Sequence, residues 1–320
     1  MRSFLFTVVS FLVFLATATL GCHCLAGEKE QAFEQGKAAL AKEDFDLAIS
    51  CFTEAIRLDP KYALAYSYRG KTYEKKGDTD RAITDCTDAI RIAPKDAWVY
   101  YNRSEVYLAK ADYDRAIADC TEAIRLDPNF AEAYGYRGRA YQKKGDLDKA
   151  IADCTEAIRL DSKCVIAYFA RGTAYAVKGD TDRAIADFTE VIQLDPKGTT
   201  AYGCRGRAYR EKGEFDKAIA DYTEAIQLDP KHVGAYYNRG CVPSKKGDHD
   251  KAISDYTEAI QLDPQNGRAF CARGNSYSQK ADKAKAKADF AQAKKLGCKA
   301  KPDRNAAVDF FWEIFRFFTK

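Results

Sequence analysis

Residues 131–164, AEAYGYRGRAYQKKGDLDKAIADCTEAIRLDSKC, contain two segments with helical periodicity. In the first segment Tyr134, Gly138 and Tyr141 follow one another at intervals of four and three residues, which places them on one face of an α-helix. The second segment repeats these intervals at Ala150, Cys154 and Ala157. The tripeptide Lys-Gly-Asp at 144–146 lies between them and supplies a helix stop and an N-cap. The stretch therefore predicts a helical hairpin.

The same pattern recurs every 34 residues along the chain. The pair Ala-Ile occurs at this interval without an insertion, at Ala48-Ile49, Ala82-Ile83, Ala116-Ile117, Ala150-Ile151, Ala184-Ile185, Ala218-Ile219 and Ala252-Ile253. Prolines keep the same register at Pro60, Pro94, Pro128, Pro196, Pro230 and Pro264. A fixed period of this length is the sequence signature of a repeat architecture. Eight units of 34 residues then cover residues 29–300 of the 320-residue chain.

Within a unit, Tyr at the fourth place, Gly at the eighth, Tyr at the eleventh, Ala at the twentieth and twenty-seventh and Pro at the thirty-second resemble the tetratricopeptide repeat family. The resemblance implies an all-α fold, a right-handed superhelical solenoid of eight 34-residue helical hairpins. It also implies a noncatalytic protein-protein interaction scaffold, whose first helices line a concave groove for a peptide or helical segment of a partner.

The family's groove positions map onto residues of the first helices, at Tyr68, Lys71, Trp98, Tyr101, Asn102, Tyr136, Arg139, Phe169, Arg207, Tyr237, Asn238 and Arg268. The mapping also includes Leu64, Glu105, Glu132, Ile166, Thr173, Arg210 and Asn275. Aromatic side chains with interspersed Arg and Lys suit a peptide ligand. The alternative for each residue is that it completes the packing between helices. A clamp for a chaperone's C-terminal carboxylate is not expected, because the residues around Asn102 and Asn238 depart from that pattern.

Two recurring features predict how the helices of a unit meet. Seven units carry an Arg and, sixteen residues later, an Asp, whereas the first unit has Gln35 and Cys51. This joint absence favours an ion pair between the two helices; duplicated surface charge is the alternative. A glycine recurs in the middle of the first helix although it costs roughly 1 kcal/mol relative to Ala. We infer a close helix contact there, with an Ala of the second helix opposite.

Pro243 predicts a shortened or bent first helix in the seventh unit and a looser groove.

Composition argues against several classes of function. The 51 Lys and Arg exceed the 47 Asp and Glu by only four, so no nucleic acid partner is expected. Three His and the absence of a recurring nucleophile with an activating base predict no catalytic residue, no metal site and no cofactor.

Among the cysteines, Cys86, Cys120 and Cys154 fall on an inward position and are interpreted as small core residues. On first helices, Cys204, Cys241 and Cys271 are either reactive thiols or tolerated small residues.

The N-terminus has the outline of an export signal. Arg2 precedes seventeen uncharged residues, 4–20, and Ala26 suits cleavage after it. Residues 1–26 are therefore predicted to be a signal peptide or a retained N-terminal anchor, and the protein to be exported to a periplasmic, extracellular or lumenal compartment. Lipidation of Cys22 is a third alternative, although Leu20 lies one place too close to it for the usual pattern.

The C-terminal end differs from the internal units. Lys287 and Lys294 replace Ile253 and Ile260 of the preceding unit, so the solenoid is expected to stop there. Residues 301–320 are basic at first and then rich in aromatic residues, and they predict an additional C-terminal helix. Three roles remain open for this helix: capping of the solenoid, self-association, or contact with a membrane interface. The alternative function is a membrane-attached assembly factor anchored by its N-terminal segment, this helix or both.

Overall fold

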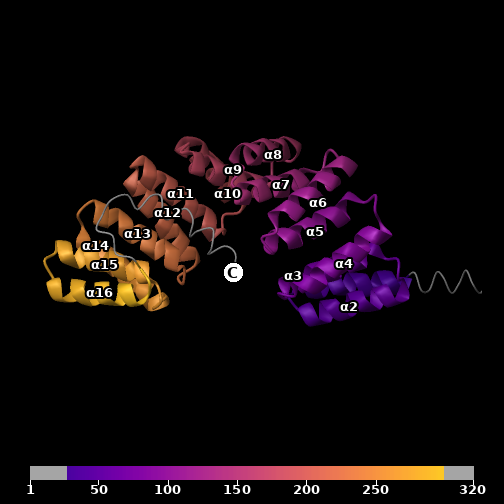
Figure 1. The fold of residues 1–320 in the computed structure, drawn as a ribbon, viewed down its shortest axis with the longest axis horizontal. Helices are drawn as coiled ribbons and strands as arrows, with labels where there is room; N and C mark the ends of the chain where they lie inside the picture. Colours follow the sequence, from indigo (N-terminus) through magenta and orange to yellow (C-terminus); the bar gives the residue numbers. More distant parts are fainter. Residues whose placement is uncertain (1–26, 299–320) are drawn as a thin grey trace, which may run out of the picture. The chain divides into compact units, whose positions relative to one another are not determined.

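The computed structural model describes residues 27–298. This part of the chain contains helices and no strand (Figure 1). It forms two compact units, one up to residue 140 and one from residue 141 onward. The signal peptide or anchor predicted for residues 1–26, Cys22 within it, and the helix predicted for residues 301–320 lie outside the described residues.

The first unit consists of antiparallel helical hairpins that follow one another along the chain. A helix over residues 27–41 precedes α2 (Phe45–Leu58), α3 (Ala63–Lys75), α4 (Thr79–Ile92), α5 (Ala97–Ala109) and α6 (Tyr113–Leu126). Helices α3 and α4 pack closely on each other, as do α5 and α6, and the first helices α3 and α5 of these two hairpins also touch. The unit boundary falls within α7 (Ala131–Lys144).

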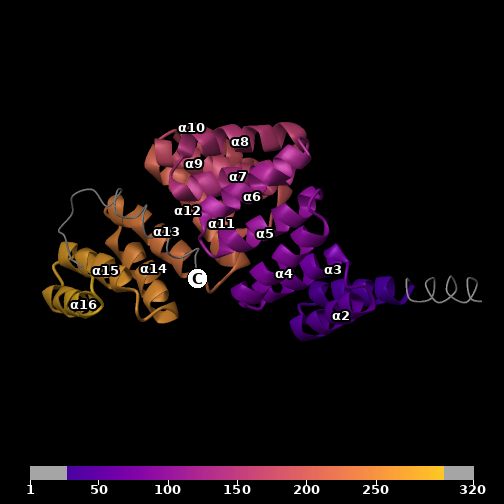
Figure 2. The same cartoon turned by 45° about the vertical axis from the view of Figure 1, so that its right-hand side comes forward.

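The second unit continues the same arrangement. Its helices are α8 (Leu147–Leu160), α9 (Val165–Lys178), α10 (Thr181–Leu194), α11 (Thr199–Lys212), α12 (Phe215–Leu228), α13 (Val233–Lys245), α14 (His249–Leu262), α15 (Gly267–Gln279) and α16 (Lys283–Lys295). The last hairpin, α15 and α16, lies side by side in both views (Figures 1 and 2). The first helices α9, α11, α13 and α15 contact one another in sequence, so they form one wall of this unit.

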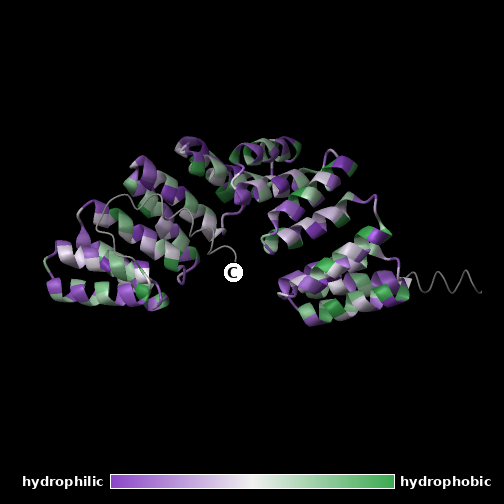
Figure 3. Ribbon diagram, in the orientation of Figure 1, coloured by the Kyte–Doolittle hydropathy of each residue, from purple (hydrophilic) through white to green (hydrophobic). Residues whose placement is uncertain are grey.

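Local signals explain where the helices begin and end. An Asp caps most second helices; the side chain of Asp180, for example, accepts a hydrogen bond from the amide of Arg183. The preceding Gly179 adopts a left-handed conformation, with φ of +81°, and ends α9. Hydrophobic and hydrophilic residues occur together on the helices (Figure 3), as amphipathic helices that bury one face require.

The predicted close approach of the two helices at the recurring glycines is confirmed. A Cβ atom added to Gly36 would lie 2.6 Å from a ring carbon of Phe52, and one added to Gly206 would lie 2.9 Å from a ring carbon of Tyr222. The predicted partner, an Ala of the second helix, is met at Gly70, where the backbone oxygen of Ala82 lies 3.0 Å from the added Cβ, but it is not among the nearest atoms at Gly36 or Gly206. The residue opposite the glycine is the one four places beyond the Ala, because its larger side chain reaches across to the first helix. Cys86 takes this place opposite Gly70, at 2.9 Å.

The predicted ion pairs between the helices of a hairpin are also confirmed. Arg103 holds Asp119 through two hydrogen bonds of 2.8 Å each, and both side chains are largely buried. The third arm of the guanidinium donates to the hydroxyl of Thr87, 3.2 Å away on the preceding hairpin. Each such arginine therefore ties its own hairpin together and also fastens it to the previous one. The same arrangement recurs at Arg69, Arg171, Arg205, Arg239 and Arg273.

The shortening predicted at Pro243 was wrong. Helix α13 has 13 residues, as many as α3 and α5. Pro243 lies two residues before the last residue of α13, so it removes one amide donor near the end and leaves the earlier turns intact. The amide of Lys246 still donates to the carbonyl of Val242, at 3.1 Å.

The remaining predictions about the interior agree with the structure. Cys86, Cys120 and Cys154 are completely buried, as expected for core residues. On α16, Lys287 and Lys294 are exposed, so the second helix of the last hairpin presents a hydrated face where the preceding hairpin has the buried Ile260.

Candidate functional site

The first unit gathers three of its predicted groove residues, Trp98, Tyr101 and Tyr136, into an aromatic cluster. The ring of Tyr101 lies 5.4 Å from that of Trp98 and 5.0 Å from that of Tyr136, both with perpendicular geometry. Phe130, which sequence reasoning missed, completes the cluster at 4.9 Å from Trp98. Tyr101 is only 7% exposed whereas Trp98 is 51% exposed. Tyr101 therefore serves packing, and Trp98 is the ring available to a partner.

Polar groups beside this cluster are bound to one another. Lys71 lies 3.2 Å from one carboxylate oxygen of Glu105, and the hydroxyl of Tyr136 donates to the other at 2.5 Å. Burial and the charge of Glu105 raise the pKa of the nearby Glu74 carboxyl. The ammonium group of Lys71, a predicted groove residue, is thus already neutralised by a carboxylate of the same surface.

The other predicted residues of the first unit lie around these groups. Tyr68 packs its ring against those of Phe33 and Phe52, at 5.1 and 5.8 Å, so its role is structural. Asn102 and Arg139 are half-buried. Burial raises the pKa of Tyr136, and the Arg139 guanidinium offsets part of that rise, which places Arg139 close to the aromatic cluster.

The second unit brings together arginines from two first helices. Arg207 on α11 is 7% exposed, and its Nε lies 3.7 Å from Glu211 of the same helix. Arg210, one turn further along, is half-buried, and among the described residues its guanidinium forms no ion pair with a carboxylate. Burial lowers the pKa of Arg210, but Tyr222, Cys241 and Glu211 together outweigh this effect and raise it.

Tyrosines connect the arginines. Burial raises the pKa of Tyr222, which Arg210 and Arg207 oppose. Cys241 and burial raise the pKa of Tyr237, which Arg268 and Arg210 oppose. Each tyrosine therefore lies within electrostatic reach of two arginines. We call the set formed by Arg207, Arg210, Tyr237, Asn238 and Arg268 the basic surface.

Two buried polar atoms near the basic surface have no hydrogen-bond partner among the described residues: the hydroxyl of Tyr222 and the amide oxygen of Asn238. Buried polar groups are nearly always hydrogen-bonded, and the Tyr222 hydroxyl lies within electrostatic reach of Arg207 and Arg210. Phe169, by contrast, does not join the basic surface. It packs on Phe188 at 5.8 Å and against the apolar cluster around Val191 and Ala201.

Sequence reasoning did not assign Tyr222, Cys241 or Glu211 to the site, although all three act on Arg210. Arg210 was mapped to the groove from the family pattern, but nothing in the sequence distinguished it from the other basic residues. Arg210 forms no ion pair among the described residues, a property it shares with Arg139 of the first unit; what distinguishes it is that it acts on Tyr222 together with Arg207 and on Tyr237 together with Arg268, which depends on neighbouring helices.

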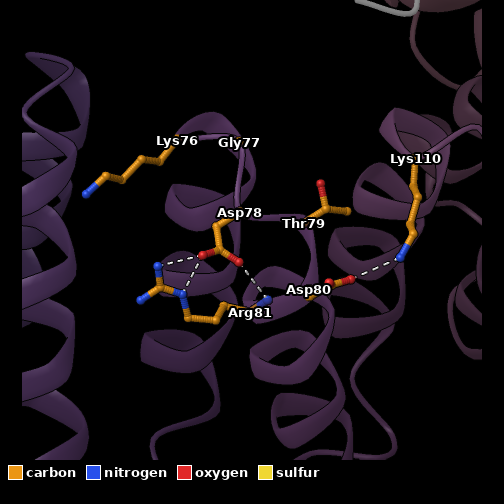
Figure 4. A pocket seen from close by; sticks show the side chains of 7 residues that line it. All are labelled: Lys76, Gly77, Asp78, Thr79, Asp80, Arg81 and Lys110. Atoms are coloured by element: carbon orange, nitrogen blue, oxygen red, sulfur yellow. Dashed lines mark hydrogen bonds and ion pairs between the residues drawn. The ribbon is translucent and has the colours of Figure 1, made fainter.

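A hollow at the turn between α3 and α4 is lined by residues 76–81 and Lys110 (Figure 4). Arg81 pairs with Asp78 inside it, and Lys110 lies 3.1 Å from Asp80. The second unit repeats this hollow, with Lys178 to Asp182 and Lys212 in the same places. Its charges are paired with neighbours and its residues recur with the repeat, so it belongs to the scaffold rather than to a ligand site.

The described residues include no group of three or more His, Cys, Asp or Glu that could hold a metal ion. His232 has a structural task, because its Nδ1 accepts a hydrogen bond from the amide of Ala235 and caps α13. Within residues 27–298, no helix is both long enough and apolar enough to cross a membrane.

Solved structures of several repeat proteins resemble the chain. A tetratricopeptide repeat protein from Parabacteroides merdae is 19% identical over 78% of this chain and 99% of its own length, with a TM-score of 0.58. YrrB, described as a TPR protein with an unusual peptide-binding site, is 25% identical over 59% of this chain and 97% of its own, with a TM-score of 0.50. A chain of the APC/C hetero-tetramer Cut9-Hcn1 is 16% identical over 88% of this chain and 54% of that chain, with a TM-score of 0.63. No curated protein matches the chain.

Family models cover nearly the whole described part. A tetratricopeptide repeat model matches residues 33–97, 101–163 and 137–199, and two others match 233–266 and 267–296. A further model, TPR repeat, matches residues 206–242. The repeated hairpins, their arginine ties and these matches agree, and the chain belongs to the tetratricopeptide repeat family.

Proposed function

We propose that the protein is a noncatalytic scaffold that binds an acidic polypeptide segment of a partner at the basic surface of its second unit. Proteins of this family bind protein or peptide partners, and the similar YrrB is described as having a peptide-binding site. The observation that carries the proposal is the half-buried guanidinium of Arg210, which lacks a carboxylate partner among the described residues.

The physical argument concerns desolvated charge. A charged group that is partly removed from water is costly unless it is paired and hydrogen-bonded. A ligand carboxylate would supply the missing partner and could bind a guanidinium through two parallel hydrogen bonds. A peptide also carries N–H donors, which the amide oxygen of Asn238 lacks among the described residues.

The first unit is the weaker candidate for the same role. Its Arg139 is also half-buried and forms no ion pair among the described residues, but Lys71 is already paired with Glu105, and Glu74 adds negative charge nearby. Trp98 offers apolar contact area, which contributes affinity without selecting for charge. An acidic ligand therefore favours the second unit.

The test uses three fluorescein-labelled ten-residue peptides that differ only at five positions, which hold Glu, Gln or Lys. Fluorescence anisotropy is measured with the full chain. We expect the Glu peptide to bind at least about tenfold more tightly than the Gln peptide, since each lost charged hydrogen bond costs 1.5 kcal/mol or more. We expect Arg210→Gln to remove most of this difference.

Lys197→Gln is the matched control, because it also removes one positive charge from the second unit but at an exposed residue. It should leave the affinity for the Glu peptide almost unchanged. Arg268→Gln provides an independent variant if Arg210→Gln fails to fold. Equal binding of the Glu and Gln peptides, or equal losses in the Lys197 and Arg210 variants, would contradict the proposal.

We also propose that the chain is exported, on the basis of the uncharged residues 4–20 and Ala26. The mass of the mature protein tests this, because cleavage after Ala26 leaves Gly27 at the N-terminus. An intact Met1 would leave only the anchored form, and dependence of extraction on detergent would then support the membrane-attached assembly factor.

Truncation at Pro302, followed by liposome binding and sizing, tests membrane contact and self-association through residues 301–320.

A further inference from the structure

We propose that Cys271 and Cys298 form a disulfide bond when the protein meets a disulfide oxidant, joining α15 covalently to the chain immediately after α16. This inference is independent of the peptide-binding proposal. Cys271 and Cys298 are present as thiols, not joined to each other, in the structure.

The end of α16 folds Cys298 back toward α15. Gly297 has a φ of +76°, a left-handed conformation that reverses the chain. The amide of Cys298 then donates to the carbonyl of Ala293, at 2.9 Å. As a result, a Cβ added to Gly267, the first residue of α15, would lie 3.2 Å from the Cβ of Cys298.

Cys271 lies one helical turn beyond Gly267, on the same face of α15. Side chains on a helix point toward its N-terminus, so the thiol of Cys271 is directed back over Gly267. The thiol of Cys298 lies close enough to Cys271 to raise its pKa. The absence of a side chain at Gly267 leaves room for Cys298 to reach this place, which a Cβ would fill.

Exposure also distinguishes this pair from the cysteines of the core. Cys86, Cys120 and Cys154 are completely buried, where an oxidant cannot reach them. Cys271 and Cys298 are both partly exposed. Burial and the neighbouring Cys298 raise the pKa of Cys271 to about 11, which lowers its thiolate fraction at neutral pH. Oxidation is therefore slow, and the quantity to measure is the equilibrium after long incubation.

The reaction is a thiol-disulfide exchange with a small-molecule disulfide. One cysteine thiolate attacks the oxidant, forms a mixed disulfide and releases the first thiolate. The second cysteine then attacks the protein sulfur of that mixed disulfide and releases the other thiolate. The two cysteines lose two protons and two electrons, which reduce the oxidant to two thiols. An exported chain would meet oxidants of this class.

The experiment equilibrates the full chain for a day in oxidised or in reduced glutathione, followed by alkylation, trypsin digestion and mass spectrometry without reduction. Trypsin releases Cys271 in residues 269–273 and Cys298 in residues 296–299, each with a single cysteine. We expect these two peptides to be joined after oxidation and separately alkylated after reduction. The joined peptide should be about 2 Da lighter than the sum of the two thiol peptides.

Three variants interpret the result. Cys271→Ser and Cys298→Ser should each abolish the joined peptide, whereas Cys241→Ser on α13 should leave it unchanged. In the oxidised protein, amides of residues 293–298 should exchange with deuterium several-fold more slowly, because the cross-link opposes fraying. Alkylation of both cysteines after oxidation, or pairing of either with a different cysteine, would overturn the proposal.

Discussion

At Gly206 the distance between two helices is limited by the absence of a side chain. The ring of Tyr222 occupies the space in which a Cβ would lie, so the helix interior tolerates a residue with poor helix propensity. Gly203 is three residues earlier on the same helix, and a Cβ there would meet no atom within 4 Å. One helix thus contains a glycine that packing requires and one that packing does not.

This contrast gives a matched pair of substitutions. Gly206→Ala should lower the free energy of unfolding by about 1–3 kcal/mol, because the added methyl group forces Tyr222 and the backbone apart. Gly203→Ala should raise it by about 0.5–1 kcal/mol through helix propensity alone. Urea denaturation followed by circular dichroism measures both, and changes of the same sign would contradict the packing argument.

Arg171 and Asp187 represent the tie between the helices of a hairpin. Asp187 is largely buried, so Arg171→Ala leaves a desolvated carboxylate and should cost about 3–5 kcal/mol. The double variant Arg171→Ala, Asp187→Ala should lose less than the sum of the two single losses, by about 1 kcal/mol or more. Additive losses would show that the charges act independently.

The exposed pair of Lys178 and Asp148 serves as the control for this cycle. Asp148 has 88% of its side chain exposed. Lys178→Ala should therefore cost less than about 1 kcal/mol, as exposed ion pairs do. A loss comparable to that of Arg171→Ala would mean that burial is not the reason for the difference.

Among the helices, α13 contains a residue that disfavours helical structure, Pro243. Pro243 removes one amide hydrogen bond near the end of α13. The residue at the same place in α9 is Tyr175, which keeps its amide. Amides of Ser244 to Lys246 should exchange with deuterium about tenfold faster than those of Ala176 to Lys178, because opening there breaks one bond fewer. Pro243→Tyr should remove the difference. Equal protection of the two segments in the unaltered protein would refute the predicted loosening.

The helices could be predicted from the sequence because their signals are local. The capping Asp residues and the turn glycines each act within a few residues, and the 34-residue period repeats these local signals along the chain. The burial of Tyr101 and the full length of α13 could not be predicted from such local signals. Tyr101 is buried because Phe130 and Tyr136 surround it, and α13 keeps its length because Pro243 comes so late in it. The basic surface was predicted in part, but the lack of an ion pair at Arg210 among the described residues depends on three-dimensional packing.

For the whole molecule, the two compact units share a hairpin design but differ in the chemistry of their first helices. The first presents Trp98 and one half-buried arginine, Arg139, beside paired charges, and the second presents two half-buried arginines, Arg210 and Arg268. The net charge of only +4 conceals this concentration of positive charge. Selectivity for an acidic partner is therefore expected from one unit rather than from the chain's overall charge.

The most direct measurement of this claim is photo-crosslinking of the Glu peptide carrying a single benzoylphenylalanine, with the cross-linked residues identified by mass spectrometry. The account predicts cross-links on α11, α13 and α15, and their disappearance when unlabelled Glu peptide, but not Gln peptide, is added in excess. Cross-links confined to the first unit or to α12, α14 and α16 would contradict it.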